Sequence, residues 1–245
     1  MSKKNSVVIT SALRTAVGTL GGSLKNISAH ELGAAVIDKS IDGSRIKKNE
    51  IDEVIMGQVL TGGTGQNPAR QAALKCNIPK ETPAYVVNQV CGSGIRSVVS
   101  GFQSIKSNNS KIVVAGGQEN MSLAPHAIHL RDGKKLGDAE IIDTMIKDGL
   151  WDAFNGYHMG VTAENVADKW KINRKDQDDF ALSSQYKAEK AQKEGKFKNE
   201  IVPVFKKENS SQNKFEVDEY PRAGMSLERL EKLKSAFKKN GTVTA

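Results

Sequence analysis

The chain has 245 residues, 38% hydrophobic and 26% charged, which is typical of a soluble globular protein with one large or two ordinary domains. Its two cysteines are too few for a disulfide scaffold and are expected to be reduced thiols. The apolar run at 7–9 is too short for a signal peptide or a membrane span, so we expect a cytoplasmic protein with no membrane partner. The net charge of +8 is compatible with a polyphosphorylated small ligand.

Expected strands and helices alternate along the first 120 residues. The strand candidates are 7–10, 54–58, 85–90 and 111–115, the third of them expected to be buried. Between them we predict three helices: one opened by a capping box of Ser28 and Glu31, with Leu32, Ala35 and Val36 as its apolar stripe, one ending near residue 75, and one after residue 92. This alternation predicts an α/β fold, with a parallel or mixed sheet covered by helices and a ligand site at the carboxyl ends of the strands.

Cys91 stands where the third expected strand stops and an amphipathic helix begins, followed by the turn Gly92-Ser93-Gly94. The free N–H groups and the positive dipole end of a helix start favour a thiolate. The glycines leave room for a substrate carbonyl, and a nearby backbone N–H can help to hold an oxyanion. This arrangement indicates a nucleophile elbow with sulfur in place of a hydroxyl. A buried structural thiol is the alternative, since free cysteine is among the most buried residue types.

Two other patterns are weighed as binding sites. The glycine-rich turn at 61–65 lacks both the G-K-[ST] ending and the G-x-G-x-x-G pattern, so we do not predict a phosphate loop. His126 and His129 lie three residues apart, but no cysteine or second acid–histidine pair completes a set of ligands. No metal site is therefore expected.

Residues 121–245 form the helix-rich part of the sequence. We predict a helix from an N-cap at Thr162 to Lys169, and a second one capped by Asn173 and stopped by Gly195. A short edge strand at 200–206 is interrupted by proline, and a last helix capped by Ser226 is expected to turn Leu227, Leu230, Leu233 and Phe237 inward. Acidic residues interrupt the Lys-rich stretch 187–207, so nucleic-acid binding is a poor alternative.

Six motifs carry a resemblance to a known family. In chain order they are QNPARQAAL at 66–74, NQVCGSG at 88–94, AGGQENMS at 115–122, GYHMGVTAENVA at 156–167, DEYPR at 218–222 and GTVTA at 241–245. They resemble the motifs of the thiolases, the acetyl-CoA acetyltransferase family, and their order and spacing match from end to end. The run GYHMG is similar to the biosynthetic branch, which forms acetoacetyl-CoA.

The resemblance implies a thiolase-like mixed sheet in residues 1–120 and a helix-rich loop domain that binds coenzyme A in residues 121–245. By the same resemblance, Cys91 is the catalytic nucleophile that takes the acetyl group as a thioester. The implied coenzyme A-binding residues are Leu150, His158, Met159, Arg222, Phe237 and Ala245. Coenzyme A thioesters are substrates here, and no cofactor or metal is implied.

The resemblance also implies that the C-terminal thiolase domain is absent, together with the strand that closes the first sheet. That domain carries the histidine that activates the nucleophile, the asparagine of an oxyanion hole and a second, acid–base cysteine. We therefore expect either an acetyl-CoA C-acetyltransferase part that needs a C-terminal half, in a homo-oligomer or paired with a C-terminal thiolase chain, or a non-catalytic coenzyme A-binding fragment. The sequence leaves these alternatives open.

Overall fold

The computed structural model describes residues 6–205 and 214–244, and the chain forms two compact units. Unit 1 comprises Met1–Met145 and Glu200–Val217, and unit 2 comprises Ile146–Asn199 and Asp218–Ala245. The functional division of the chain at residue 120 stays a prediction.

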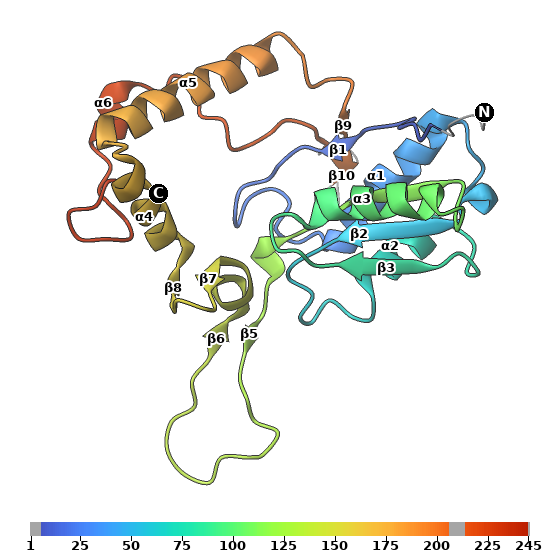
Figure 1. The fold of residues 1–245 in the computed structure, drawn as a ribbon, viewed down its shortest axis with the longest axis horizontal. Helices are drawn as coiled ribbons and strands as arrows, with labels where there is room; N and C mark the ends of the chain where they lie inside the picture. The colour runs from blue at the N-terminus through green and yellow to red at the C-terminus, as the bar shows by residue number, and fades with distance from the viewer. Residues whose placement is uncertain (1–5, 206–213, 245) are drawn as a thin grey trace. The chain divides into compact units, whose positions relative to one another are not determined.

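Unit 1 holds most of the strands and three of the helices among the described residues (Figure 1). Its helices are α1 (Ala29–Ser44), α2 (Pro68–Lys75) and α3 (Ser93–Lys106), with short 3-10 turns at Lys48–Glu50 and Met121–Leu123. Its strands are β1 (Arg14–Thr15), β2 (Glu53–Gly57), β3 (Ala84–Val87), β4 (Val113–Gly117), β5 (His126–Ala127), β6 (Ile142–Asp143), β9 (Ile201–Val202), β10 (Val204–Phe205) and β11 (Lys214–Phe215).

The described part of unit 2 is mainly helical. Its elements are β7 (Trp151–Asp152), β8 (Tyr157–His158), α4 (Met159–Trp170), α5 (Arg174–Lys193) and α6 (Leu227–Glu231). A π-helix, Met145–Leu150, joins the two units in sequence. None of the helices in 6–205 and 214–244 combines the length and the apolar composition that a membrane span requires.

A three-stranded parallel sheet in the order β3-β2-β4 is the centre of unit 1. Successive side chains of β2 point to opposite faces. Val54 and Met56 pack into a core with α1 and α2, in which Ile37 and Ala72 are also buried. Gly57 faces the other side, where α3 lies against β2 and β4 (Figure 1). The predicted α/β sheet covered by helices is therefore confirmed.

Helix α3 turns small side chains, and not its apolar stripe, toward the sheet. Its buried residues are Ser93, Ser97 and Gly101, and the Ser97 hydroxyl donates to the Gly116 carbonyl of β4 at 2.6 Å. Ile95 stays 74% exposed and Phe102 49% exposed. Small residues allow the helix backbone to approach the strands closely, which leaves the apolar stripe predicted from the sequence outside the core of unit 1.

The prediction of a first strand at 7–10 is wrong. Those residues lack ladder partners within the described chain, and the first strand is β1, which pairs with β9 in parallel. Strand β4 is consequently an edge of the sheet, because β2 is its only strand partner in the part of the chain that the structure describes. A cavity of about 650 Å³ separates β4 from residues 7–17, with side chains of α1 and α3 along its walls, among them Val36, Val98 and Phe102.

The helix boundaries partly differ from the predictions. The capping box of Ser28 and Glu31 is confirmed at the start of α1, but the buried stripe of that helix contains Leu32, Ala34, Ile37 and Ile41 and not Ala35 or Val36. β3 is also shorter and less buried than expected, since Tyr85 is 38% exposed.

In unit 2, Asn173 caps α5 as predicted, with Asp176 completing the capping box. However, α4 begins at Met159 and not near Thr162, because His158 Nδ1 accepts the Gly160 N–H at 3.0 Å and caps the helix earlier. α6 starts after Ser226 but ends at Glu231, so Phe237 lies outside it.

In unit 1, Pro203 separates β9 from β10, as expected, while residue 206 of the predicted strand lies outside the described residues.

Candidate active site

Cys91 lies on an exposed corner between β3 and α3. The corner is fixed by short-range hydrogen bonds. The Asn88 carboxamide oxygen accepts the Val90 N–H at 2.9 Å, and the Ser93 hydroxyl donates to the Val90 carbonyl at 2.6 Å. The same hydroxyl accepts the Gln89 N–H at 2.8 Å. The sulfur is therefore presented by a turn whose backbone is held on both sides, and the buried-thiol alternative is wrong for Cys91.

The residue before the cysteine adopts a strained backbone conformation. Val90 has φ of 48°, which is a rare value for a β-branched residue. Such strain persists only where the surroundings hold the backbone in place, and it concentrates at functional sites. Residue type alone gives no signal for this feature, so the sequence reasoning missed it. The positive φ of Val90 therefore gives the corner the sharp, strained turn that is expected of a nucleophile elbow.

The turn uses some of the N–H groups that were expected near the sulfur. The Gly92 N–H donates to the Gln89 carbonyl at 3.0 Å, and the Ser93 N–H donates to the Val90 carbonyl at 3.0 Å. Neither group is then available to an oxyanion in this conformation, so oxyanion stabilisation by these two groups would require the turn to change.

Two glycines of the sheet form the floor under the start of α3. A Cβ added at Gly57 would lie 2.4 Å from the Ser93 carbonyl carbon and 2.5 Å from the Gly94 nitrogen. A Cβ at Gly117 would lie 3.3 Å from the Gly94 Cα. Both glycines end parallel strands, so the corner with Cys91 rests on the carboxyl edge of the sheet, where the sequence predicted a ligand site.

Buried polar side chains gather at this same edge. Gln118 donates to the Gln58 carboxamide oxygen at 2.9 Å, and one Glu119 carboxylate oxygen accepts the N–H groups of Val59 and Leu60 at 2.9 and 3.2 Å. Gln118 Oε1 and Glu119 Oε1 are buried without a hydrogen-bond partner among the described residues. Burial raises the pKa of Glu119, although the backbone N–H bonds act in the opposite direction. The sequence reasoning quoted Glu119 only as part of a motif and missed this environment.

In unit 2 the structure brings His158 and Phe237 together. Their rings stack with centroids 4.9 Å apart and an angle of 15° between the planes. Because His158 Nδ1 accepts the Gly160 N–H, the neutral imidazole carries its proton on Nε2. The predicted pair of ligand-facing residues is thus a single stacked unit with a defined tautomer.

The other residues predicted to bind coenzyme A are located only by the elements that contain them or by their neighbours in the chain. Leu150 directly precedes Trp151, the strand partner of His158, and Met159 is the first residue of α4 with 43% of its surface exposed. Arg222 is exposed, and its backbone N–H donates to the Gln185 side chain at 2.9 Å. Ala245 lies outside the described residues.

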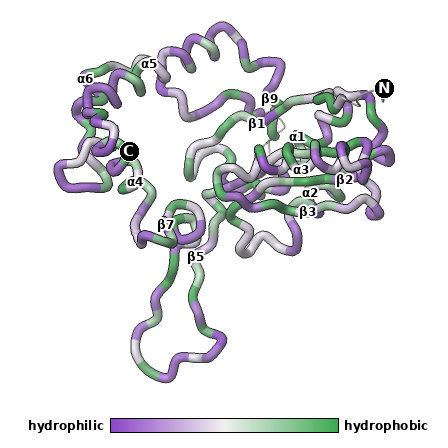
Figure 2. Tube along the Cα trace, viewed as in Figure 1, coloured by the Kyte–Doolittle hydropathy of each residue, from purple (hydrophilic) through white to green (hydrophobic). Residues whose placement is uncertain are grey.

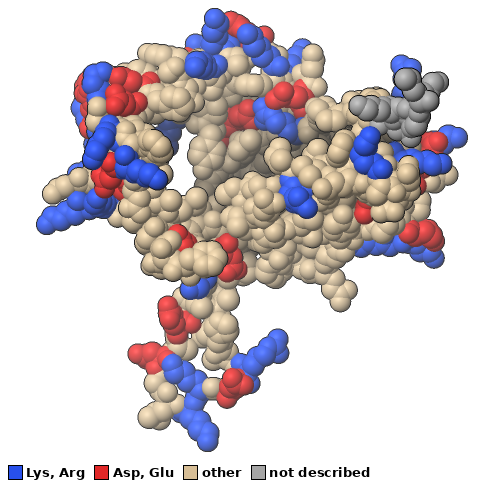
Figure 3. Space-filling model, viewed as in Figure 1, with Lys and Arg blue, Asp and Glu red and all other residues tan. Residues whose placement is uncertain are grey.

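The charge pattern of the described chain does not indicate a nucleic-acid surface. On the visible face, basic and acidic side chains lie near one another in separate groups, with large uncharged areas between them (Figure 3). In the described part of the Lys-rich stretch, Lys193 pairs with Glu189 at 2.6 Å and Lys196 with Glu194 at 3.0 Å. Along α5, hydrophilic and hydrophobic residues are mixed, whereas β2 is mainly hydrophobic (Figure 2).

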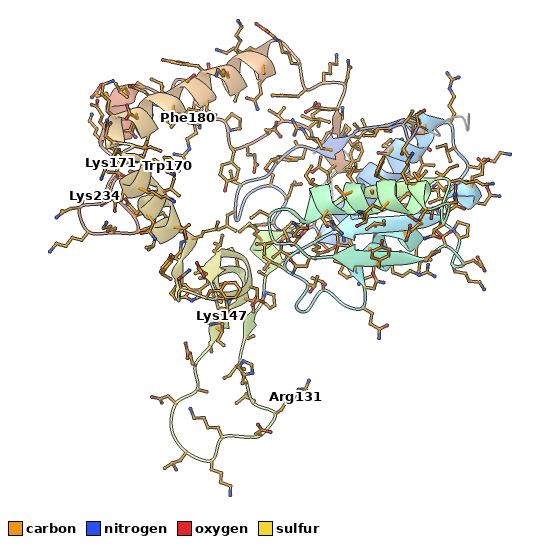
Figure 4. The ribbon with its side chains drawn as sticks, viewed as in Figure 1. Arg131, Lys147, Trp170, Lys171, Phe180 and Lys234 are labelled. Atoms are coloured by element: carbon orange, nitrogen blue, oxygen red, sulfur yellow. The ribbon has the colours of Figure 1, made fainter. Side chains whose placement is uncertain are left out.

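Exposed aromatic side chains of unit 2 also lie outside any defined site. Trp170, at the end of α4, and Phe180, on α5, are 68% and 77% exposed (Figure 4). Lys169 Nζ lies 5.5 Å from the Trp170 ring centroid.

Within 6–205 and 214–244, no three His, Cys, Asp or Glu residues are grouped closely enough to hold a metal ion.

Comparisons with known proteins agree with the motifs. The family described as "Thiolase, N-terminal domain" matches residues 7–245. The acetyl-CoA acetyltransferase of Rhizobium meliloti (strain 1021) is 56% identical over 240 residues, which cover 98% of this chain and 61% of that protein. The cytosolic acetyl-CoA acetyltransferase of Rattus norvegicus is 48% identical over 97% of this chain and 60% of its own length.

The fold agrees as well. The crystal structure of the Bacillus anthracis acetyl-CoA acetyltransferase superposes with a TM-score of 0.93 at 39% identity, over 97% of this chain and 60% of that one. The chain thus spans about 60% of the length of the relatives it matches. With the exposed Cys91 corner, the parallel sheet and a match from residue 7 to residue 245, this chain belongs to the thiolase family, in the region of its N-terminal domain.

Proposed function

We propose that the protein transfers an acetyl group from acetyl-CoA through a thioester on Cys91. The observation that carries this proposal is the exposed sulfur on a strained, hydrogen-bonded corner at the carboxyl edge of the sheet. The names of the relatives support the class of reaction, because each of the proteins compared is called an acetyl-CoA acetyltransferase.

In the first half-reaction the Cys91 thiolate attacks the thioester carbonyl carbon of acetyl-CoA. The new C–S bond to Cys91 forms, the C–S bond to coenzyme A breaks, and coenzyme A leaves as a thiolate that takes up a proton. In the second half-reaction a second acetyl-CoA loses a methyl proton, and its carbon attacks the acetyl-Cys91 carbonyl. This step gives acetoacetyl-CoA and restores the thiol, and thiolysis is its reverse.

The second half-reaction needs a group that removes the methyl proton. No described residue near Cys91 has been assigned that role. We propose that the group belongs to the region of the relatives that this chain does not match, and that the chain alone performs at most the first half-reaction. Coenzyme A thioesters serve as substrates, and no further cofactor takes part.

Unit 2 supports the binding part of the proposal. His158 and Phe237 offer a flat, partly apolar surface with one N–H donor, which suits a thioester and its pantetheine arm. Leu150 and Met159 extend the apolar surface, Arg222 offers a cation to the nucleotide end, and Ala245 completes the proposed set. If the chain binds acetyl-CoA but Cys91 is never acetylated, a coenzyme A-binding module becomes the better description.

Mass spectrometry of the chain after incubation with acetyl-CoA separates these two functions. We expect the mass of one acetyl group on the peptide that contains Cys91, and its loss in Cys91→Ala. Cys76→Ala is the matched control, since the Cys76 thiol is 2% exposed and should not compete. Acetylation that persists in Cys91→Ala would refute the proposed nucleophile.

We further propose that the protein acts in lipid metabolism in the cytoplasm and works as a homo-oligomer or with a C-terminal thiolase chain. The exposed apolar stripe of α3 supports association, because Ile95 and Phe102 would lose contact with water there. Size-exclusion chromatography with light scattering tests the assembly, and a monomer at all concentrations would contradict it.

A further inference from the structure

Residues 235–244, here called the 235–244 loop, fold back on themselves with little regular structure. A single antiparallel bridge joins Ser235 and Thr244, and the Ala236 N–H donates to the Val243 carbonyl at 3.1 Å. The Gly241 N–H donates to the Lys238 carbonyl at 2.9 Å to close the turn. Phe237, which stacks on His158, belongs to this loop. Whatever fixes the loop to α4 therefore also fixes the stacked ring.

Glu164 makes the strongest described attachment between α4 and the loop. Its side chain is 2% exposed, and its carboxylate accepts the Thr242 N–H at 3.0 Å and the Val243 N–H at 2.9 Å. The Thr242 hydroxyl donates to the same carboxylate at 3.3 Å. Charge-assisted bonds of this kind are roughly twice as strong as neutral ones. Burial alone would raise the pKa of Glu164, but these bonds outweigh it and lower the pKa.

The helix geometry connects this attachment to the stacked ring. Gly160 and Glu164 are four residues apart and so share one face of α4. A Cβ at Gly160 would lie 2.2 Å from the Phe237 ring, and a Cβ at Gly241 would lie 2.1 Å from Glu164 Oε1. The loop thus lies directly on the helix at two points, with Phe237 at one and the carboxylate of Glu164 at the other.

We infer that Glu164 is a positioning residue for His158. By holding Thr242 and Val243 it keeps the 235–244 loop on α4, and the loop keeps the Phe237 ring flat on the imidazole. His158 is then fixed from two sides, by the Gly160 N–H at Nδ1 and by the Phe237 ring on its face. This inference deepens the proposed function and rests on it for the role of His158 toward the thioester.

Nuclear magnetic resonance of the imidazole groups tests the positioning directly. The chain has four histidines, so the His158 signals can be assigned with His158→Gln. In the unsubstituted chain we expect ring-current shifts of the His158 ring protons from Phe237. Glu164→Gln should move these signals toward those of the exposed His126, because the amide removes the negative charge from these bonds and places an NH2 donor where Oε2 accepts the Thr242 N–H and hydroxyl.

A control variant in the 235–244 loop and a second substitution of Glu164 accompany this measurement. Lys238→Ala removes the exposed ion pair with Asp168 at 2.9 Å, a weaker attachment of the same loop to α4, and should leave the His158 signals in place. Glu164→Asp keeps the charge but shortens the side chain, and an intermediate shift is expected; it decides the question if Glu164→Gln does not fold. Unchanged His158 signals in a folded Glu164 variant would overturn the inference.

A kinetic measurement connects the positioning to the reaction. If Glu164 acts through His158, the rate of Cys91 acetylation by acetyl-CoA should fall by up to about 100-fold in Glu164→Gln and remain unchanged in Lys238→Ala. A Glu164→Gln rate equal to that of the unsubstituted chain would refute the effect on the reaction. If the unsubstituted chain is not acetylated at all, the proposed function fails, while the resonance measurement still decides the positioning.

Discussion

Substituting Gly57 by alanine should displace the corner that carries Cys91. The added Cβ would lie 2.4 Å from the Ser93 carbonyl carbon and 2.5 Å from the Gly94 nitrogen, whereas carbon atoms in good contact lie about 3.5–4.0 Å apart. Both neighbours are backbone atoms, so they cannot move aside by rotating a side chain. The start of α3 must therefore move by about 1 Å, and overpacking of this kind costs about 1–3 kcal/mol of unfolding free energy.

Urea unfolding followed by circular dichroism measures that cost, and the rate of Cys91 acetylation measures the displacement of the sulfur. A shift of about 1 Å can reduce a reaction rate by about 100-fold. Gly43→Ala is the matched control, since a Cβ there meets no atom within 4 Å and alanine in α1 should stabilise by about 0.5–1 kcal/mol. If Gly57→Ala unfolds and reacts like the unsubstituted chain, α3 does not rest on this glycine.

Three further outcomes follow from the structure. A thiol reagent should modify Cys91 and spare Cys76 in the folded chain, because burial raises the pKa of Cys76 to about 11, and mass mapping that finds Cys76 modified first would contradict this. The pKa of Glu164 is lowered from 4.5, so its stabilisation is complete above pH 4.5 and is lost as the pH falls through the lowered value; the difference in unfolding free energy from Glu164→Gln should shrink on acidification, and a constant difference would count against it. Asn67→Ala removes the cap of α2, where the carboxamide oxygen accepts the Arg70 N–H at 3.1 Å, and should cost about 1–2 kcal/mol in urea unfolding, whereas an unchanged midpoint would show that the cap is not needed.

The sequence was most informative where local chemistry decides the structure. The capping residues Ser28 and Asn173 begin their helices as predicted, because a side chain that reaches its own helix start needs no distant partner. The elbow at Cys91 was predictable for the same reason, since a valine-rich strand, a cysteine and two glycines follow one another directly. The strain at Val90 was not, because it depends on how the turn is held.

Long-range contacts explain the wrong predictions. Residues 7–10 have the composition of a strand, but a strand also needs a partner, and none of the described segments pairs with them. The start of α4 was misplaced because a histidine, which is not a common cap, accepts the Gly160 N–H and begins the helix before Thr162. Phe237 was assigned to a helix by its spacing, whereas it lies in the 235–244 loop, whose position depends on Glu164.

The cavity between β4 and residues 7–17 also has a consequence for handling the protein. It combines the free edge of β4, unpaired among residues 6–205 and 214–244, with apolar walls, and such an edge offers its N–H and C=O groups to an extended segment of another molecule. At the high concentrations reached on overexpression, other copies of the chain would associate at this edge faster than they refold. The yield of folded protein should therefore rise with slow synthesis and with refolding at low concentration. A protein whose sheet has no open edge should not show this dependence.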